Sequence, residues 1–451
     1  MGITISNAWI CSIKNRTIKP VFGNLIIERG KITSIQKVDF STYLKGESNK
    51  NKNSFNAGGR VVTIPNVNFH EHIYSRLSKG LQISGSSDSF YNILDNLWWK
   101  LDRSLNLKMI ETSARMAVIE SIRNGVTYII DHHSSPVYSK GSLKQIADVV
   151  RQHDLRGVLC FETTDRNGEN FSINSLNENT RFFENETDSN IKSMFGLHAS
   201  FTLEDSTLKK VSDYISKNDI GIHIHLSEDA TDKMLSKKKF GKLPLQRLID
   251  YDLLNPQSIL SHSIHLTKDE YKKIVKYGSA IALNPESNMN NSVGINNFKL
   301  IPGELPLLCG TDGMHANPAK SLKLIFLLMR HSGFSFEEAF NRIINIYFNQ
   351  VDFIKQYFPD FSTLNENDRA DFIIHDYIPP TPFSENNFWG HYIYGILDSQ
   401  IHSVVQNGNF LMKEKKLTGI DESGAYKDIF DTGKKLFQQF KKTEKADRKK
   451  S

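Results

Sequence analysis

The sequence predicts an α/β protein: a (β/α)₈ TIM barrel with a small β-sandwich domain formed by both chain ends. Eight apolar segments of strand length recur between positions 61 and 313, and helix-patterned segments separate them. Each of the eight starts apolar and ends in polar residues that can do chemistry. Parallel barrels have this pattern because their function lies at the carboxyl ends of the strands.

The eight predicted strands follow one another through the middle of the chain. They cover residues 61–72, 126–133, 156–165, 191–201, 220–229, 257–266, 279–288 and 305–313. Residues 109–125 and 244–254 have the apolar periodicity of helices and lie between strands, as in repeated βαβ units. An open doubly wound sheet would carry a glycine-rich turn after its first strand, and no G-x-G-x-x-G or P-loop motif occurs. The pattern therefore favours a barrel.

The two chain ends resemble each other in pattern. Short strand-like segments punctuated by glycine fill residues 1–62, and similar segments return at 370–377 and 401–417. We predict that both ends build one β-domain, with the barrel inserted between them. The polar stretch 45–56 is expected to be a loop. The expected parts are 1–62 and 367–420 for the β-sandwich, 63–366 for the barrel, and 421–451 for a basic helical tail.

Composition excludes several classes of protein. With 39% hydrophobic and 24% charged residues among 451, the chain is neither disordered nor membrane-spanning, and we expect no secretory signal. Three widely spaced cysteines without a C-x-x-C pair exclude a cysteine zinc knuckle and argue against a disulfide framework. The expected location is therefore a reducing cytoplasm.

The net charge of +6 comes from the tail alone. Residues 434–451 hold eight basic residues and two acidic ones, Glu444 and Asp447, so residues 1–433 are formally neutral. We expect a solvated, frayed helix end whose apolar anchor is LFQQF at 436–440. No basic surface interleaved with aromatic residues is predicted, so the expected partners include neither nucleic acid nor a membrane.

Histidines and carboxylates gather at the predicted strand ends. His70 and His72 lie two residues apart in the first strand, so both side chains leave the same face. Nine of the 15 histidines fall at such ends: His70, His72, His132, His133, His198, His223, His225, His262 and His265. Two histidines from the first strand, one from the fifth, and Asp312 after the eighth are ligands suited to Zn²⁺ or Fe²⁺, with a position left for water.

These residues resemble the amidohydrolase superfamily and, within it, the mononuclear deaminase branch of guanine, S-adenosylhomocysteine and triazine-type aminohydrolases. The motifs are H-x-H at 70–72, H-x-x-E at 225–228, SHSIHL at 261–266 and GTDG at 310–313. The chain is most similar to SsnA-type aminohydrolases through IIDHHSSP, FETTDRNG, NPESNMNNSVG and PPTPFSENNFWGH. The resemblance covers nearly the whole chain up to residue 420.

The resemblance implies one divalent metal per chain, Zn²⁺ or Fe²⁺, with the ligands His70, His72, His225 and Asp312. Glu228 would be the general acid and His262 would assist, while Asp312 accepts a proton from the activated water. Members with two metals carry a bridging lysine at the end of the fourth strand, where this chain has His198. A single metal is therefore expected.

Six residues are candidates for substrate binding: His198, Glu162, Arg166, Asn284, Ser287 and His132. Glu162 and Arg166 would bind a polar substrate group or pair with each other, and His132 would line the pocket or brace neighbouring loops. Trp98, Trp99 and Arg103 are expected in the core and on the surface of a helix rather than in a pocket wall.

The expected activity is hydrolytic deamination of an aminated purine, pterin or pyrimidine by metal-bound hydroxide. Two alternatives remain open: hydrolysis of a cyclic amide or loss of a non-amine leaving group at the same site, and a non-catalytic metal- or ligand-binding role. Ammonia release separates deamination from the first alternative. Glu228 and His262 argue against the non-catalytic role, since a binding protein needs no proton-transfer groups. A homodimer is compatible with the sequence.

Overall fold

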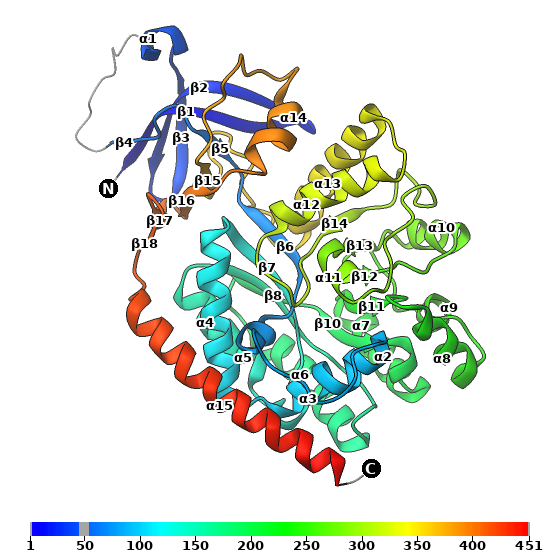
Figure 1. Cartoon of the computed structure of the whole chain (residues 1–451). Helices are drawn as coiled ribbons and strands as arrows, with labels where there is room; N and C mark the ends of the chain where they lie inside the picture. The colour runs from blue at the N-terminus through cyan, green and yellow to red at the C-terminus, as the bar shows by residue number, and fades with distance from the viewer. Residues whose placement is uncertain (1, 45–53, 450–451) are drawn as a thin grey trace.

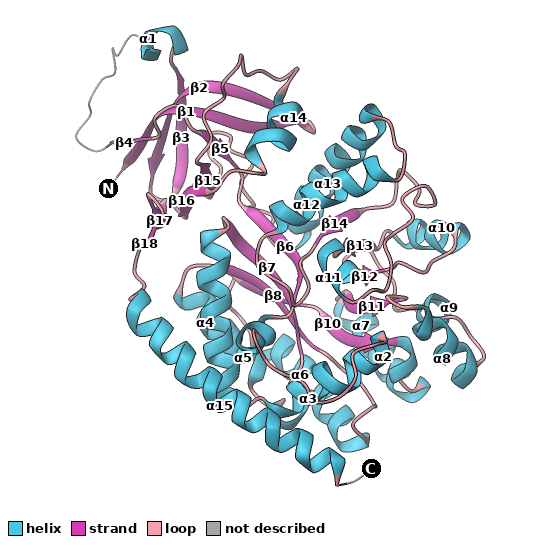
Figure 2. Cartoon of the chain, in the orientation of Figure 1, coloured by secondary structure: helices cyan, strands magenta, loops and turns pink. Residues whose placement is uncertain are grey.

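The computed structural model describes residues 2–44 and 54–449. The described strands form three sheets, of nine, five and four strands. Figure 1 shows the sheet built by both chain ends at one end of the molecule, with the parallel strands beside it. Helices surround the parallel strands, as Figure 2 shows. The chain is an α/β protein, as predicted.

The nine-stranded sheet confirms that both chain ends share one β structure. Its N-terminal strands are β1 (Ile3–Lys14), β2 (Thr17–Glu28), β3 (Lys31–Lys37), β4 (Ser54–Asn56) and β5 (Val61–Thr63). Its C-terminal strands are β15 (Phe372–His375), β16 (Ile401–Gln406), β17 (Asn409–Lys413) and β18 (Lys416–Leu417). The order is β18-β17-β16-β15-β5-β1-β2-β3, with β4 paired to β1. The two ends meet where β15 runs antiparallel to β5.

Local sequence explains the first hairpin of this sheet. Asn15 and Arg16, the two residues between β1 and β2, have φ angles of 52° and 54°. Two-residue hairpins need this left-handed backbone, which asparagine tolerates well. The predicted loop at 45–56 is described only in its last three residues, which form β4 rather than a loop, and residues 45–53 lie outside the described part.

Two parallel sheets contain the eight strands predicted for the middle of the chain. One holds β6 (Asn66–Glu71), β7 (Val126–His133), β8 (Arg156–Phe161) and β9 (Ile191–Ser193). The other holds β10 (Phe195–Ala199), β11 (Ile222–Leu226), β12 (Ile259–His262), β13 (Ala280–Leu283) and β14 (Leu307–Cys309). Most of these strand residues are buried, because helices cover parallel sheets, and their sequences are therefore apolar runs rather than alternating patterns.

The predicted strand 191–201 is divided between the two sheets. β9 pairs with β8, β10 pairs with β11, and Met194 lies between them. Isolated parallel bridges also join the sheets, between Thr163 and Leu197 on this side and between Glu71 and Asp312 on the other. The carboxyl ends of all these strands are thus brought toward one place.

The helices follow the strands in alternation. They are α4 (Leu107–Arg123), α5 (Ser142–Gln152), α6 (Glu169–Asn185), α7 (Asp205–Asn218), α8 (Ala230–Phe240), α9 (Pro244–Asp250), α10 (Lys268–Tyr277), α11 (Pro285–Asn290), α12 (Pro318–His331) and α13 (Phe336–Tyr357). α4 and α9 correspond to the two predicted helices. α10 shows why its ends fall where they do: Thr267 and Glu270 form a capping box, and Gly278 ends the helix in a left-handed conformation.

A long connection between β6 and α4 crosses the carboxyl ends of the strands. It contains η1 (Ile73–Ser78), α2 (Phe90–Ile93), η2 (Leu94–Trp98) and α3 (Trp99–Ser104). After β13 and β14 the connections are shorter. Near the C-terminal strands lie α14 (Phe388–His391) and η5 (Tyr392–Ile396), and α1 (Phe40–Leu44) follows β3.

The C-terminal helix α15 (Glu422–Arg448) runs along the outside of the molecule (Figure 1). The expectation of a frayed end is wrong, because the helix continues to Arg448, whereas the basic side chains of its last turns are exposed, as expected. Leu436 and Phe440 are fully buried in a cluster with residues of α4 and α5, and Glu444 is buried as well. Among the described residues, no helix combines the length and apolar character required to cross a bilayer.

Candidate active site

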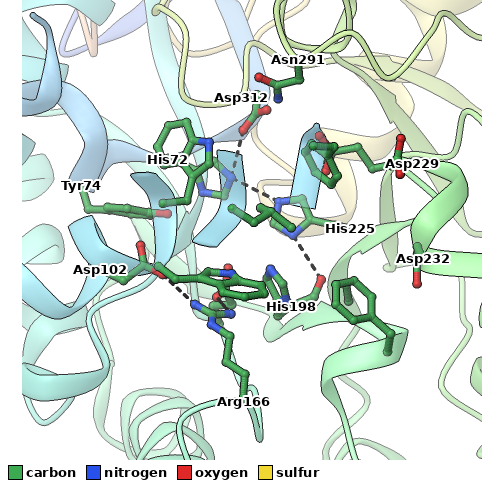
Figure 3. Close-up of a pocket in the computed structure, with 18 residues that line it drawn as sticks. His72, Tyr74, Asp102, Arg166, His198, His225, Asp229, Asp232, Asn291 and Asp312 are labelled. Carbon is green, nitrogen blue, oxygen red and sulfur yellow. Dashed lines mark hydrogen bonds and ion pairs between the residues drawn. The ribbon is translucent and has the colours of Figure 1, made fainter. Parts of the chain in front are cut away.

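A pocket lies where the carboxyl ends of the parallel strands converge (Figure 3). One side is formed by residues at or after strand ends: His72, His198, His225 and Asp312. The other side comes from the connection between β6 and α4, which contributes Phe90, Leu94, Trp98, Trp99 and Asp102. The pocket therefore joins the strand ends, which were predicted to carry the chemistry, to a segment that was not.

Three histidines and one aspartate converge at the base of this pocket. Donor atoms of His70, His72, His225 and Asp312 all lie within 4.8 Å of one another. His72 Nε2 is 2.9 Å from Asp312 Oδ1 and 3.2 Å from His225 Nε2. His70 Nε2 is 3.7 Å from the same Asp312 oxygen. The residues come from β6, β11 and the turn after β14, so three separate strand ends supply them.

The outer ring nitrogens of these histidines are held by neighbours. His72 Nδ1 donates to the His132 carbonyl at 2.6 Å, and His225 Nδ1 donates to the His198 carbonyl at 3.1 Å. Since a carbonyl can only accept, each ring carries a proton on Nδ1 and turns Nε2 toward the centre. This is how metal-binding histidines are oriented in proteins.

The centre fits a divalent metal. His70 Nε2 is buried and has no hydrogen-bond partner among the described residues, while His70 Nδ1 lies 2.9 Å from His223 Nε2. An unpartnered buried nitrogen is costly unless something else satisfies it. Imidazole nitrogens with one carboxylate oxygen are a donor set that Zn²⁺ and Fe²⁺ accept. The cluster is therefore a histidine–aspartate metal site.

The protonation of the cluster agrees with this assignment. Burial and the neighbouring histidines hold the pKa values of His70 and His225 well below their usual range, so both rings are neutral. Burial opposes protonation of His72, but Asp312 outweighs it and raises the pKa of His72 to about 9. Burial alone would raise the pKa of Asp312, yet His72 holds it below its usual range. A cation at this site would take the place of the proton on His72.

Glu228 and His262 lie next to the cluster. His262 Nε2 is 3.5 Å from Glu228 Oε2 and 3.9 Å from Asp312 Oδ2. His262 Nδ1 lies 2.8 Å from Asn288 Oδ1, which orients the ring. Burial first, and then the charge of Asp312, raises the pKa of Glu228 well above its usual range. The raised pKa favours the protonated form of the Glu228 carboxyl group, which is the form that can donate a proton.

The backbone is strained at three of the strand ends. Ser227, His262 and Asp312 have φ angles of 47°, 65° and 53°. Residues other than glycine pay about 1–3 kcal/mol for such conformations and keep them only where the surrounding structure enforces them, often at functional sites. Here the strained backbone aims His262 and Asp312 into the site. Ser287 also donates a hydrogen bond to Asp312 Oδ2.

A buried ion group forms the far wall. Arg166 Nη1 is 2.7 Å from Glu162, and Arg166 Nη2 is 2.6 Å from Asp102. The Trp99 ring lies 5.3 Å from the guanidinium, close enough for a cation–π contact. Burial raises the pKa of Asp102 to about 7 against the opposing effect of Arg166. One cation thus faces two carboxyl groups, and Asp102 Oδ1 has no hydrogen-bond partner in the described part of the chain.

The predicted substrate-binding residues fall in two groups. His198, Glu162 and Arg166 line the pocket, and Glu162 and Arg166 also pair with each other. The other three lie behind it: Ser287 bonds Asp312, Asn284 is fully buried, and His132 Nε2 lies 2.9 Å from the Leu197 carbonyl oxygen. Their roles stay predictions. Of the other histidines at strand ends, His265 lies outside the pocket, with Nε2 2.8 Å from the Val293 carbonyl.

The structure adds pocket residues that sequence reasoning placed elsewhere or missed. Trp98 and Trp99 line the pocket, contrary to the expectation of a helix core, and so do Tyr74 and Asp102. Arg103 does remain outside, where it pairs with Asp447. A signal was available, because a long connection follows the first of the parallel strands, and the active sites of strand–helix repeat folds are built from the connections that follow their strands.

Comparison with known proteins assigns the chain to a family. The model of the amidohydrolase family matches residues 61–346. The chain is 26% identical over 446 residues to a 5'-deoxyadenosine deaminase of Methanobrevibacter smithii, covering 95% of this chain and 96% of the relative. It is 24% identical over 420 residues to a 5-methylthioadenosine/S-adenosylhomocysteine deaminase of Thermococcus sibiricus, covering 91% and 94%. This chain belongs to the amidohydrolase family.

Solved structures show the same fold. An adenosine deaminase from Xanthomonas campestris, solved with bound zinc, matches with a TM-score of 0.76 at 17% identity, over 96% of this chain and 98% of that one. Membership of the superfamily, predicted from the motifs, is confirmed, and so is the prediction of a hydrolase acting on carbon–nitrogen bonds.

Proposed function

We propose that this chain is a metal-dependent aminohydrolase that deaminates an adenine-type nucleoside modified at its 5' position. The observation that carries the proposal is the convergence of three histidines and Asp312 next to the Glu228–His262 pair. Relatives that span almost the whole chain are named for 5'-deoxyadenosine and for 5-methylthioadenosine and S-adenosylhomocysteine. An aminated purine was one of the three ring types expected from the sequence.

The finer structural expectations belong to the same proposal. The two parallel sheets would act as one closed (β/α)₈ barrel, which the bridges between Thr163 and Leu197 and between Glu71 and Asp312 support. The nine-stranded sheet would form the β-sandwich, with the domain limits at 62, 366 and 420. Within the family, the chain would belong to the mononuclear deaminase branch and resemble its SsnA-type members.

One divalent metal, Zn²⁺ in our proposal, would be held by His70, His72, His225 and Asp312. A metal bound by such ligands lowers the pKa of water toward neutrality and so provides a nucleophile at physiological pH. The neutral His70 and His225 rings and the ionised Asp312 are the protonation states that ligation requires.

Three side chains would move protons during the reaction. Asp312, held by Ser287, accepts the proton that the attacking water loses. Glu228, whose raised pKa favours its protonated form, would donate its proton to a ring nitrogen of the substrate. The amine would then leave as ammonia with the proton that Asp312 took from the water, and the proton of the added hydroxyl would return to Glu228. His262, oriented by Asn288, hydrogen-bonds the attacking oxygen and stabilises the charge that develops there.

The far wall would select the substrate. Trp98 and Trp99 offer aromatic faces for a planar heterocycle. His198, whose Nδ1 lies 2.8 Å from Thr202 Oγ1, presents its other nitrogen to a substrate acceptor or donor. Asp102 Oδ1, buried without a partner, is an acceptor for a substrate hydroxyl or amine. Small polar nucleosides fit this combination of aromatic and hydrogen-bonding walls.

The test is an ammonia-release assay on protein whose metal content has been measured. The substrates are 5'-deoxyadenosine, 5'-methylthioadenosine, S-adenosylhomocysteine, adenosine, guanine, an aminated pterin and cytosine. Ammonia from an adenine nucleoside, with about one metal per chain, supports the proposal. A loaded protein that releases ammonia from none of them shifts the assignment to cyclic-amide hydrolysis, and a protein without metal favours a binding role. The cytoplasmic location and the homodimer stay predictions.

A further inference from the structure

The C-terminal half of α15 lies against segment 84–104, which contributes Asp102 to the far wall of the pocket. In Figure 1 the last turns of α15 pass beside α3, and the two helices are packed together. The segment 84–104 supplies Trp98, Trp99 and Asp102 to the pocket. The helix itself does not line the pocket, so any influence on substrate must act through this segment.

The first contact ties the start of the segment. Glu444 Oε1 accepts hydrogen bonds from the Ser84 backbone N–H at 3.0 Å and from the Ser84 hydroxyl at 2.6 Å. Glu444 is buried, whereas residues 84–89 are exposed and form neither helix nor strand. An exposed stretch rich in serine and glycine has little preference for one backbone conformation. The carboxylate therefore supplies an anchor that the local sequence does not.

The second contact reaches the pocket residue Trp99 through Arg103. Asp447 Oδ2 accepts a hydrogen bond from Arg103 Nη2 at 2.6 Å, and Arg103 Nε donates to the Trp99 carbonyl at 3.1 Å. One residue further along, the Ser104 hydroxyl donates to Thr443 Oγ1 at 2.9 Å. Trp99 in turn stacks on Arg166. A short chain of contacts thus connects Asp447 to the ion group of the pocket.

An apolar seam supports both polar contacts. Leu436 and Phe440 are fully buried in the same cluster as Leu101 and Leu105, and Leu97 and Trp98 pack against that cluster. Glu444 and Asp447 are also the only acidic residues within 434–451, where eight residues are basic. Both exceptions to the charge pattern contact the pocket segment.

We propose that Glu444 and Asp447 are positioning residues that hold segment 84–104 in the shape that places Trp99 and Asp102 against the substrate. The proposal rests on the proposed function of the pocket and adds a determinant of substrate affinity outside it. Because Glu228 and His262 lie on other elements, α15 affects the affinity for substrate rather than the proton-transfer steps. KM should therefore respond more strongly than kcat.

The experiment compares four variants of the full chain: Glu444→Ala, Glu444→Gln, Asp447→Ala and Asp431→Ala. The last is the matched control, since Asp431 is an exposed carboxylate of α15 whose ion pair is with Lys434 of the same helix. We expect Glu444→Ala and Asp447→Ala to raise KM about tenfold, with a smaller change in kcat and unchanged metal content. Glu444→Gln should restore KM, because its amide oxygen can accept both hydrogen bonds of Ser84.

Hydrogen–deuterium exchange over residues 81–104 gives a second readout that needs no activity. Faster exchange in Glu444→Ala and Asp447→Ala, but not in Asp431→Ala, supports the positioning role even if no tested substrate is turned over. Unchanged exchange and unchanged KM in both alanine variants overturn it. A Glu444→Gln variant as impaired as the alanine variant overturns it as well. If Glu444→Ala does not fold, Asp447→Ala decides by the same criteria.

Discussion

Oε2 of Glu228 lies 3.5 Å from Nε2 of His262, and the two belong to different parts of the chain, the loop after β11 and the end of β12. The first is a buried carboxyl group with a raised pKa, and the second is an imidazole whose pKa is lowered by burial. A carboxyl group with a raised pKa beside an imidazole with a lowered pKa is the pairing expected for proton transfer to a leaving group.

Glu228→Gln should keep its metal and lose turnover. The amide has the size of the carboxyl group but cannot donate its proton to the substrate ring, so kcat should fall by about 10²–10⁴-fold. Metal analysis and steady-state kinetics on the same preparation check this. Glu204→Gln, which removes a carboxylate from an exposed pair with Lys239, serves as the control. Substantial turnover in Glu228→Gln would remove Glu228 from the mechanism.

His70→Ala and Asp312→Ala should each lower metal content. Each substitution removes one of the four converging donor atoms, and a divalent ion binds weakly to the three that remain. The measurement is metal per chain after dialysis against a weak chelator. His265→Gln is the comparison, since His265 contacts the Val293 carbonyl away from the site and its loss should leave the metal in place. Full occupancy in His70→Ala would disprove the ligand assignment.

Arg166→Met should destabilise the fold as well as the pocket. Arg166, Asp102 and Glu162 have side chains that are at most 8% exposed, so the substitution leaves two buried carboxyl groups without their cation. Breaking a buried ion pair in this way costs about 3–5 kcal/mol of unfolding free energy. Urea denaturation measures it.

Lys144→Met is the matched control for this loss of charge. Lys144 is 69% exposed in its pair with Asp148, so its removal should cost under about 1 kcal/mol. Equal stability changes in the two variants would show that solvent screens the charges around Arg166 as it screens those of a surface ion pair.

His375 should make stability depend on pH. Burial lowers its pKa from 6.5 to about 3, so the folded chain holds it neutral while the unfolded chain protonates it below pH 6.5. Its contribution is complete above the unfolded pKa and is lost as the pH falls toward 3. At pH 5 the loss amounts to about 2 kcal/mol. Comparison of urea midpoints at pH 7 and pH 5 for wild type and His375→Gln isolates the contribution of His375 to the free energy of unfolding.

The control for the pH experiment is His331→Gln, which removes an exposed histidine at the end of α12. This variant shows how far the loss of any histidine changes the pH dependence of stability. If His375→Gln loses as much stability between pH 7 and pH 5 as wild type does, the pH dependence does not come from His375.

Much of the fold and the metal cluster was predictable from the sequence. The eight apolar segments are strands in two parallel sheets. The four predicted metal ligands, which come from the H-x-H, H-x-x-E and GTDG motifs, converge. These features are local, because strand periodicity and the residue type at each strand end are encoded within a few positions. Parallel strands then bring their carboxyl ends to one edge without further information.

The far wall of the pocket and the role of the tail were decided by tertiary structure. Nothing near Asp102 in the chain indicates that it faces Arg166, 64 positions away, and the basic pattern of α15 hides the fact that Glu444 binds Ser84. Such contacts depend on how separate elements pack, and a single favourable contact leaves no periodic trace in the sequence. Local pattern therefore determined the strands and their reactive ends, whereas long-range packing alone decided which segment closes the pocket and what holds it there.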